Sequence, residues 1–194
     1  MEKSLLYYIG EFLDDKQRAD FAKAEVISIS LVENDSRLVI EAYFPEYTGY
    51  RKVRHAARNV RVGLGISDVV ITERYEPHML TSSCVADLTA AAKDLKAVTN
   101  GFLDEAEVEL TSTELIYRLK NGADIINSND TAPALERYIS NAFSVRRKVS
   151  FTGDTKVSID NPEYLKMQHD AVDPINFMAL EDAKKKEPKQ EYED

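Results

Sequence analysis

Residues 106–119 read Ala-Glu-Val-Glu-Leu-Thr-Ser-Thr-Glu-Leu-Ile-Tyr-Arg-Leu, and this stretch decides the fold of the second half of the chain. Apolar and acidic residues alternate over 105–111, and apolar residues return at every second position over 114–119. A period of two predicts two β-strands. The glutamates of the first strand fall opposite its apolar residues, so we interpret them as a solvated sheet surface and not as general acid–base groups.

Helices are expected on both sides of these strands. Before them, Thr81-Ser82-Ser83 can cap a helix whose buried stripe contains Val85, Leu88, Ala92 and Leu95. After them, residues 123–126 predict a short helical turn. Asp130 or Thr131 then caps a further helix with a buried face of Leu135, Tyr138, Ile139, Ala142 and Phe143. Residues 148–151 predict a last strand, which completes the order helix, strand, strand, helix, helix, strand.

The first half of the chain shows a similar order. A stripe over 4–14 predicts a helix, and alternating residues over 25–32 and 37–44 predict two strands. A second helix is expected over 50–61, ended by Gly63 and Gly65, and a third strand at 69–71.

The expected fold class is therefore α+β, with two small modules at 1–76 and 77–153, separated near Pro77. Each module is close to the lower size limit for an independent core, so we expect the two to pack on each other. Residues 154–180 have scattered apolar positions and predict a loosely ordered strap. Residues 181–194 are mostly charged and predict a linker or tail.

Composition excludes several classes of protein. The chain has 194 residues, a net charge of −9 and one cysteine, so an internal disulfide scaffold is excluded. We find no secretory signal and no membrane-spanning run, which favours a reducing cytoplasmic location. No motif predicts a metal or a cofactor, and Cys84 is interpreted as a core residue and not as a nucleophile. No catalytic residue is predicted.

The strongest local signal is a basic helix with no acidic residue, which contains Arg51, Lys52, Arg54, His55, Arg58 and Arg61. A second basic cluster, Arg146-Arg147-Lys148, precedes the last strand. One interpretation is a docking surface for an acidic partner or for phosphates. The other is a solvated face whose cations pair with acids of the same chain. We expect a protein partner before DNA, because the chain as a whole is acidic.

The order of elements in the second half resembles the type II KH arrangement. Residues 106–119, followed by the helix with Leu135, Tyr138, Ile139 and Phe143, resemble the N-terminal region of PolC-type DNA polymerase III alpha subunits. A KH domain that binds nucleic acid uses a Gly-x-x-Gly loop between two helices, and residues 126–131 contain no glycine here. RNA binding through that loop is therefore not expected.

This resemblance implies a non-catalytic N-terminal interaction region of a bacterial replicative polymerase. The parent protein would be a DNA-directed DNA polymerase with 3′–5′ exonuclease activity, and the 194 residues would contact replisome proteins such as the clamp loader, with DNA as a weaker partner. The first module is similar to the C-terminal region of the clamp-loader tau subunit. Two alternatives stay open, namely a free-standing adaptor or regulatory protein and a small enzyme with an unrecognised site.

Overall fold

The computed structural model describes residues 3–32 and 36–153, so the strap and the tail expected at 154–180 and 181–194 lie outside the described residues. The first half contains α1 (Leu5–Ile9), α2 (Asp15–Asp20), β1 (Glu25–Val32), β2 (Arg37–Tyr43), α3 (Tyr50–Leu64) and β3 (Asp68–Arg74). The second half contains α4 (Val85–Leu95), β4 (Glu107–Leu110), β5 (Glu114–Leu119), α5 (Ala123–Asn127), α6 (Thr131–Phe143) and β6 (Lys148–Gly153). Short 3-10 turns are formed by Gly10–Phe12, Pro77–Met79, Ser82–Cys84 and Ala97–Thr99.

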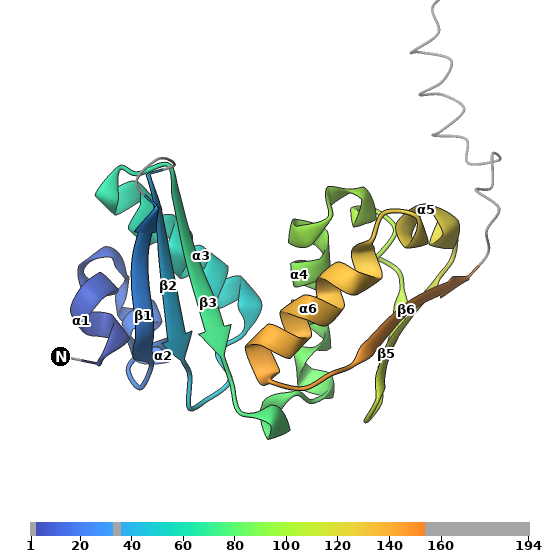
Figure 1. Ribbon diagram of the computed structural model, residues 1–194, viewed down its shortest axis with the longest axis horizontal. Coiled ribbons are helices and arrows are strands. Elements are labelled where there is room, and N and C mark those ends of the chain that lie inside the picture. Colours follow the sequence, from blue (N-terminus) through green and yellow to red (C-terminus); the bar gives the residue numbers. More distant parts are fainter. Residues whose placement is uncertain (1–2, 33–35, 154–194) are drawn as a thin grey trace, which may run out of the picture. The chain divides into compact units, whose positions relative to one another are not determined.

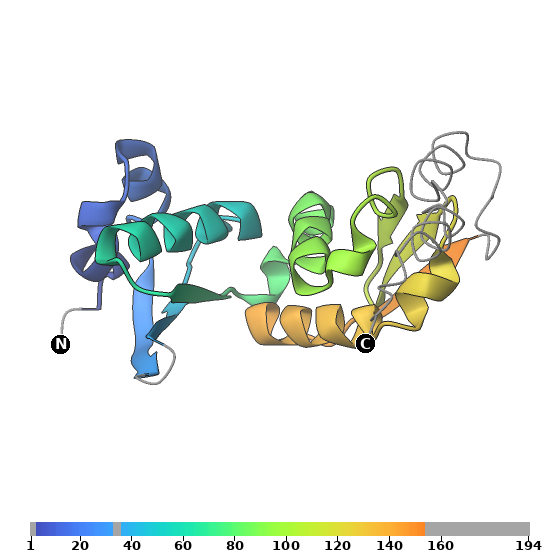
Figure 2. The ribbon, with the colours of Figure 1, turned by 90° about the horizontal axis from the view of Figure 1, so that it is seen from above.

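The α+β fold class is confirmed, and the two three-stranded sheets share one topology. In the first sheet β1 and β2 are antiparallel and β2 and β3 are parallel. In the second sheet β4 and β5 are antiparallel and β5 and β6 are parallel. The parallel pairs require a crossover, which α3 supplies in one sheet and α5 with α6 supply in the other. Figures 1 and 2 show helices against one face of each sheet.

The alternating sequence pattern explains which face of the first sheet is buried. Ile40 of β2 lies beside Ile71 of β3 in the parallel register, and both side chains are buried. They pack under the apolar stripe of α3, which consists of Tyr50, Val53, Ala56, Ala57 and Val60. The prediction of an amphipathic helix over 50–61 is confirmed, although the helix continues to Leu64 and ends at Gly65, whose φ of 65° is the left-handed conformation of a helix C-cap.

Two local predictions are wrong, and a third is confirmed only in part. The helix expected over 4–14 stops at Ile9, and the chain then forms a separate helix, α2. The start of α2 has a sequence signal that the prediction missed, a capping box. The Asp14 carboxylate accepts the Gln17 backbone amide at 2.8 Å, and the Gln17 side chain accepts the Asp14 backbone amide at 3.2 Å. The N-cap residue of α4 is Cys84 and not one of residues 81–83, and Asp130 is the N-cap residue of α6 as predicted but has a left-handed φ of 52° and makes no side-chain cap hydrogen bond.

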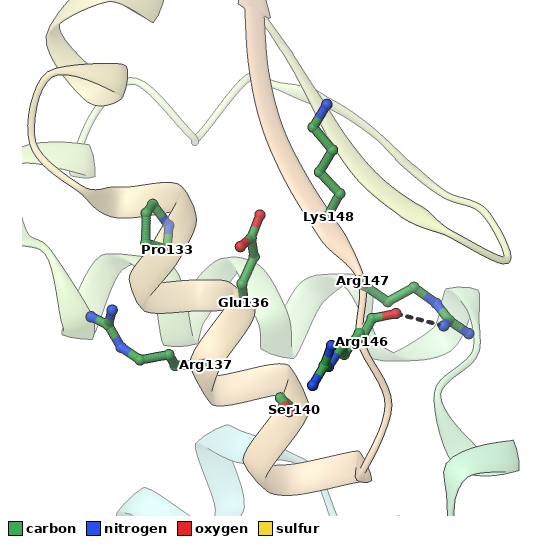
Figure 3. A pocket seen from close by; sticks show the side chains of 7 residues that line it. All are labelled: Pro133, Glu136, Arg137, Ser140, Arg146, Arg147 and Lys148. Carbon is green, nitrogen blue, oxygen red and sulfur yellow. Dashed lines mark hydrogen bonds between the residues drawn. The ribbon is translucent and has the colours of Figure 1, made fainter.

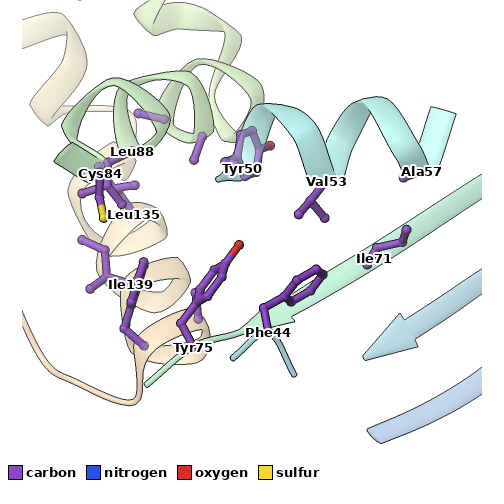
Figure 4. Packing of buried hydrophobic residues seen from close by; sticks show 14 of the residues in the cluster. Phe44, Tyr50, Val53, Ala57, Ile71, Tyr75, Cys84, Leu88, Leu135 and Ile139 are labelled. Carbon is purple, nitrogen blue, oxygen red and sulfur yellow. The ribbon is translucent and has the colours of Figure 1, made fainter. Parts of the chain in front are cut away.

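An aromatic seam joins the two halves of the chain, and we define it as Phe44, Tyr47, Tyr50, Tyr75, Tyr138 and Phe143. Tyr75 follows β3 and stacks on Phe143 of α6 with 5.1 Å between the ring centroids. Its backbone amide also donates to the carbonyl of Ala142 at 2.7 Å. Figure 4 shows Tyr50 and Tyr75 on the side of α4 and α6, and Phe44 next to Tyr75 on the side of Val53 and Ile71. The expectation that the two modules pack on each other is therefore confirmed.

Candidate functional site

The basic helix predicted from the sequence is α3, and two of its cations are paired within the chain. The Arg51 guanidinium contacts the Asp87 carboxylate on α4 at 2.9 Å. The Lys52 ammonium contacts Asp20 of α2 at 2.8 Å. Arg54 is half-buried and lies over the ring of Tyr50, 5.0 Å from its centroid, in a cation–π contact. Half of the predicted docking set is therefore engaged internally.

The other cations of α3 lie on its exposed side. His55, Arg58 and Arg61 are exposed and form no ion pair with another described residue. A shallow hollow of about 250 Å³ separates α3 from α4, and Arg54, His55 and Arg58 line it together with Asp94. The Asp94 carboxylate accepts the Tyr50 hydroxyl at 3.0 Å and partly offsets the positive charge of the hollow.

The second basic cluster lies in a larger hollow, which we call the cationic groove. It has a volume of about 490 Å³ between α6 and the start of β6, and Pro133, Glu136, Arg137, Ser140, Arg146, Arg147 and Lys148 line it. Figure 3 shows the helix residues on one side and the three consecutive cations on the other. The fold thus adds Arg137 and Ser140 to the cluster predicted from the sequence.

The four cations of the cationic groove have no acidic partner among the described residues. Arg137, Arg146 and Lys148 are exposed, and Arg147 is half-buried with one nitrogen, Nη1, donating to the Arg146 carbonyl at 3.0 Å. The single acid of the groove, Glu136, accepts the backbone amide of Val149 at 2.9 Å. All four cations keep unused donors for a negatively charged ligand, and Figure 3 shows the Arg137 and Arg147 side chains extending outward on opposite sides of the groove.

Sequence reasoning missed the α6 wall of the groove, although a signal for it exists. Pro133, Glu136, Arg137 and Ser140 follow one another at i, i+3, i+4 and i+7, which places them on one face of a helix. That face is opposite to the buried stripe with Leu135 and Ile139. Nothing in the sequence, however, brings this face beside residues 146–148, since the pairing depends on how α6 packs against β6.

A buried carboxylate lies near the aromatic seam. Glu73 of β3 is 3% exposed, and its Oε1 accepts the hydroxyl of Tyr138 from α6 at 2.5 Å. Burial raises the pKa of Glu73 above its ordinary value, and the Tyr138 hydrogen bond and the nearby Arg54 charge offset this only in part. Burial, and then the charge of Glu73, also raises the pKa of Tyr138. The pair is a polar contact between the two halves of the chain.

The raised pKa of Glu73 predicts a pH dependence of stability. A group whose pKa is raised on folding stabilises the native state most at low pH, and this contribution is lost as the pH rises through the folded-state pKa. Glu73→Gln keeps an oxygen acceptor for Tyr138 without the charge. We therefore expect the variant to melt at the same temperature as wild type near pH 4.5 and about 2–4 °C higher at pH 8.

Thermal melts of both proteins at the two pH values measure this difference. The matched control is Glu76→Gln, because Glu76 accepts a tyrosine hydroxyl in the same way, from Tyr43 at 3.1 Å, but is exposed. The control should shift the melting temperature equally at both pH values. A difference between wild type and Glu73→Gln that does not change with pH would contradict the role of the buried charge.

Within residues 3–32 and 36–153, no group of three or more His, Cys, Asp or Glu side chains has the arrangement of a metal site. None of the described helices is long and apolar enough to cross a membrane. Cys84 is buried, as expected of a core residue, and its thiol donates to the Met79 carbonyl at 3.2 Å.

Comparisons with known proteins identify no family for this chain. No family model matches it, and no curated protein matches it. One solved structure, described as "Crystal structure of APE1850", is 17% identical, and the alignment covers 76% of this chain and 96% of that chain with a TM-score of 0.28. A likeness at that level says nothing about the fold or the activity of this chain.

Proposed function

We propose that this chain is a non-catalytic binding module that holds an acidic segment of a partner protein in the cationic groove. The observation that carries the proposal is the absence of any acidic partner, among the described residues, for the four cations that line the groove. In a chain of net charge −9, unpaired cations gathered on one hollow create a local field of the opposite sign.

The proposed ligand is a protein segment and not a nucleic acid. The remaining surface has many carboxylates, including the exposed Glu107 of β4 and its neighbours Glu105 and Glu109, which pair with Lys120 and Arg118. A DNA backbone extends beyond the groove and would meet this negative charge, whereas a short acidic peptide would end within it. Screening acts over about 8–10 Å at physiological ionic strength, so the distant carboxylates act weakly on a ligand confined to the groove.

The proposal agrees with the resemblance to the N-terminal region of PolC-type polymerases. In that setting the chain is a non-catalytic interaction region of a bacterial replicative DNA polymerase in the cytoplasm, and the acidic segment belongs to another replisome protein such as a clamp-loader component. The internal pairing of Arg51 and Lys52 supports the groove as the primary docking surface. The exposed His55, Arg58 and Arg61 make a secondary one.

A binding titration with a fluorescent twelve-residue peptide of glutamate and aspartate tests the proposal. We expect binding at 50 mM salt that weakens steadily as salt is added, and weaker binding of a DNA duplex of similar length. Arg137→Glu/Arg146→Glu should reduce the affinity for the peptide about tenfold or more, because both positions are exposed and repel a carboxylate after the change.

The matched control is Arg58→Glu/Arg61→Glu, which changes the net charge by the same amount on α3. We expect less than a threefold loss from this control. Equal losses from both double variants would mean that net charge and not the groove controls binding, and tighter binding of DNA than of the peptide would reject the proposed class of ligand.

A further inference from the structure

The outer edge of β1 differs from the other sheet edges of the molecule. β1 lies at the end of the first sheet and pairs only with β2 (Figure 1). Its first residues are covered, because the Val26 amide donates to the Lys3 carbonyl at 2.6 Å and Ser4 forms an isolated bridge with Glu25. From Ile27 to Val32 no backbone hydrogen bond to a described residue outside β2 covers this edge. Open strand edges can pair with another strand.

The side chains of β1 are exposed in spite of their apolar character. Ile27, Ile29 and Leu31 are 54%, 42% and 60% exposed, and Val32 is also exposed. These four residues are half of the eight large hydrophobic side chains that are exposed in the described part of the chain. Ile29 lies opposite the buried Ile40 in the β1–β2 register, so it extends the apolar face of the sheet to an edge that no backbone of the described residues covers at this point.

The other three edges carry the features that prevent pairing. At β6 the outward amide of Val149 is bound by the Glu136 carboxylate, and the carbonyl of Phe151 accepts the Asn127 side chain at 3.0 Å. β4 has only four residues and two of them are glutamates. β3 carries Asp68, Glu73 and Arg74 and lies against α6. The segment Val26–Val32 has neither a charge nor a proline.

The sequence of this segment indicates what would cover it. Residues 26–32 read Val-Ile-Ser-Ile-Ser-Leu-Val, which is the same in both directions apart from the exchange of Ile27 and Leu31. In an antiparallel pair centred on Ile29, the uncovered residues 27–31 would face their own copy with isoleucine opposite leucine and serine opposite serine. A twofold axis requires this kind of self-complementarity.

We propose that β1 pairs with β1 of a second copy of this chain, antiparallel about Ile29, to form a symmetric dimer with a continuous six-stranded sheet. The β-bulge between Val26 and Ser28 lies at one end and leaves Ser28–Val32 in regular register with β2. The pairing uses up the open edge of both copies, so the assembly closes at two chains.

Charge gives the dimer a distinctive salt dependence. Each chain carries a net charge of −9, so two copies repel each other. Added salt screens this repulsion, so the dimer becomes tighter with salt. Peptide binding in the cationic groove becomes weaker under the same conditions, and the failure of one proposal is therefore distinguishable from the failure of the other.

Sedimentation of the 194-residue chain over about 1–200 μM tests the proposal. We expect a monomer–dimer equilibrium that shifts toward the dimer with salt. Ile29→Lys should weaken the dimer about tenfold or more, because the two lysines meet at the axis. Val62→Lys is the matched control, since Val62 is exposed on α3, and it should leave the equilibrium unchanged.

A disulfide cross-linking experiment tests the same pairing and does not require the Ile29→Lys variant to fold. Ile29→Cys should form an intermolecular disulfide under mild oxidation, whereas Val62→Cys should not, and the buried Cys84 should leave the wild type uncross-linked. A wild-type chain that stays monomeric at 200 μM would overturn the proposal. A dimer that Ile29→Lys leaves intact, or Ile29→Cys and Val62→Cys chains that cross-link equally, would overturn it as well.

Discussion

Phe143→Ala is expected to lower the free energy of unfolding by about 3–5 kcal/mol, the usual cost of truncating a buried phenylalanine. Phe143 is 1% exposed at the end of α6, and its ring stacks on Tyr75 and Tyr47 from the first half of the chain. The change removes the centre of the aromatic seam and leaves a cavity between elements that belong to different sheets. Chemical denaturation followed by circular dichroism measures the loss.

A double-mutant cycle shows whether this loss comes from the seam. Phe143→Ala and Tyr75→Ala should be coupled by about 0.5–3 kcal/mol, because the rings are in contact. The matched control is Phe151→Ala, since Phe151 is also buried and stacked, but on Tyr117 within the second sheet. Its coupling to Tyr75→Ala should be close to zero. A loss below about 1 kcal/mol for Phe143→Ala, or equal coupling in both cycles, would mean that the two halves are held together elsewhere.

The second large effect is expected from Gly49→Ala, immediately before α3. Gly49 has a φ of 92°, and an added Cβ would lie 2.5 Å from Oδ2 of Asp87. Asp87 accepts the Tyr47 hydroxyl at 3.1 Å and the Arg51 guanidinium at 2.9 Å, so a displaced carboxylate breaks contacts between α4 and the first half. Backbone strain and lost hydrogen bonds together predict a destabilisation of about 2–5 kcal/mol.

Gly65→Ala separates these two contributions. Gly65 also has a positive φ, 65°, but no atom of the structure lies within 4 Å of an added Cβ. This control should cost only the backbone strain, about 1–2 kcal/mol. Thermal and chemical denaturation of both variants give the comparison. If the two glycine substitutions destabilise equally, the Asp87 contacts contribute nothing measurable, and the polar link between α4 and α3 is not part of the stability of the protein.

Most of the secondary structure could be predicted because it depends on local patterns. Leu115, Tyr117 and Leu119 alternate and do form the buried face of β5, and the stripe of Leu135 and Ile139 does form the buried face of α6. The errors occur where packing overrides a local signal. Gly63 looked like a helix end, but α3 continues through it, and an added Cβ there would lie 2.2 Å from the Phe12 ring. The glycine allows α3 to approach the N-terminal segment.

The candidate site could be predicted only in part. Arg146, Arg147 and Lys148 are adjacent in the chain, so their cluster is visible in the sequence, whereas Arg137 joins them only because α6 packs beside β6. On α3, in contrast, the tertiary structure removes residues from the predicted set. Six cationic or titratable residues suggested one surface, but Asp20 and Asp87, both more than 30 residues away in sequence, pair with two of them. Ion pairs of this kind depend on tertiary contacts.

By itself, the sequence determined the α+β class, the order of the strands and of the helices other than α2, and the position of the two basic clusters, because periodicity and local charge do not depend on distant contacts. The tertiary structure decided which of these features face solvent. Ile29 and Ile40 belong to equally regular alternating strands, yet Ile40 is buried beneath α3 and Ile29 is exposed at the sheet edge. Periodicity specifies the face of a strand on which a residue lies, and only the packing of a helix or a neighbouring strand removes that face from water.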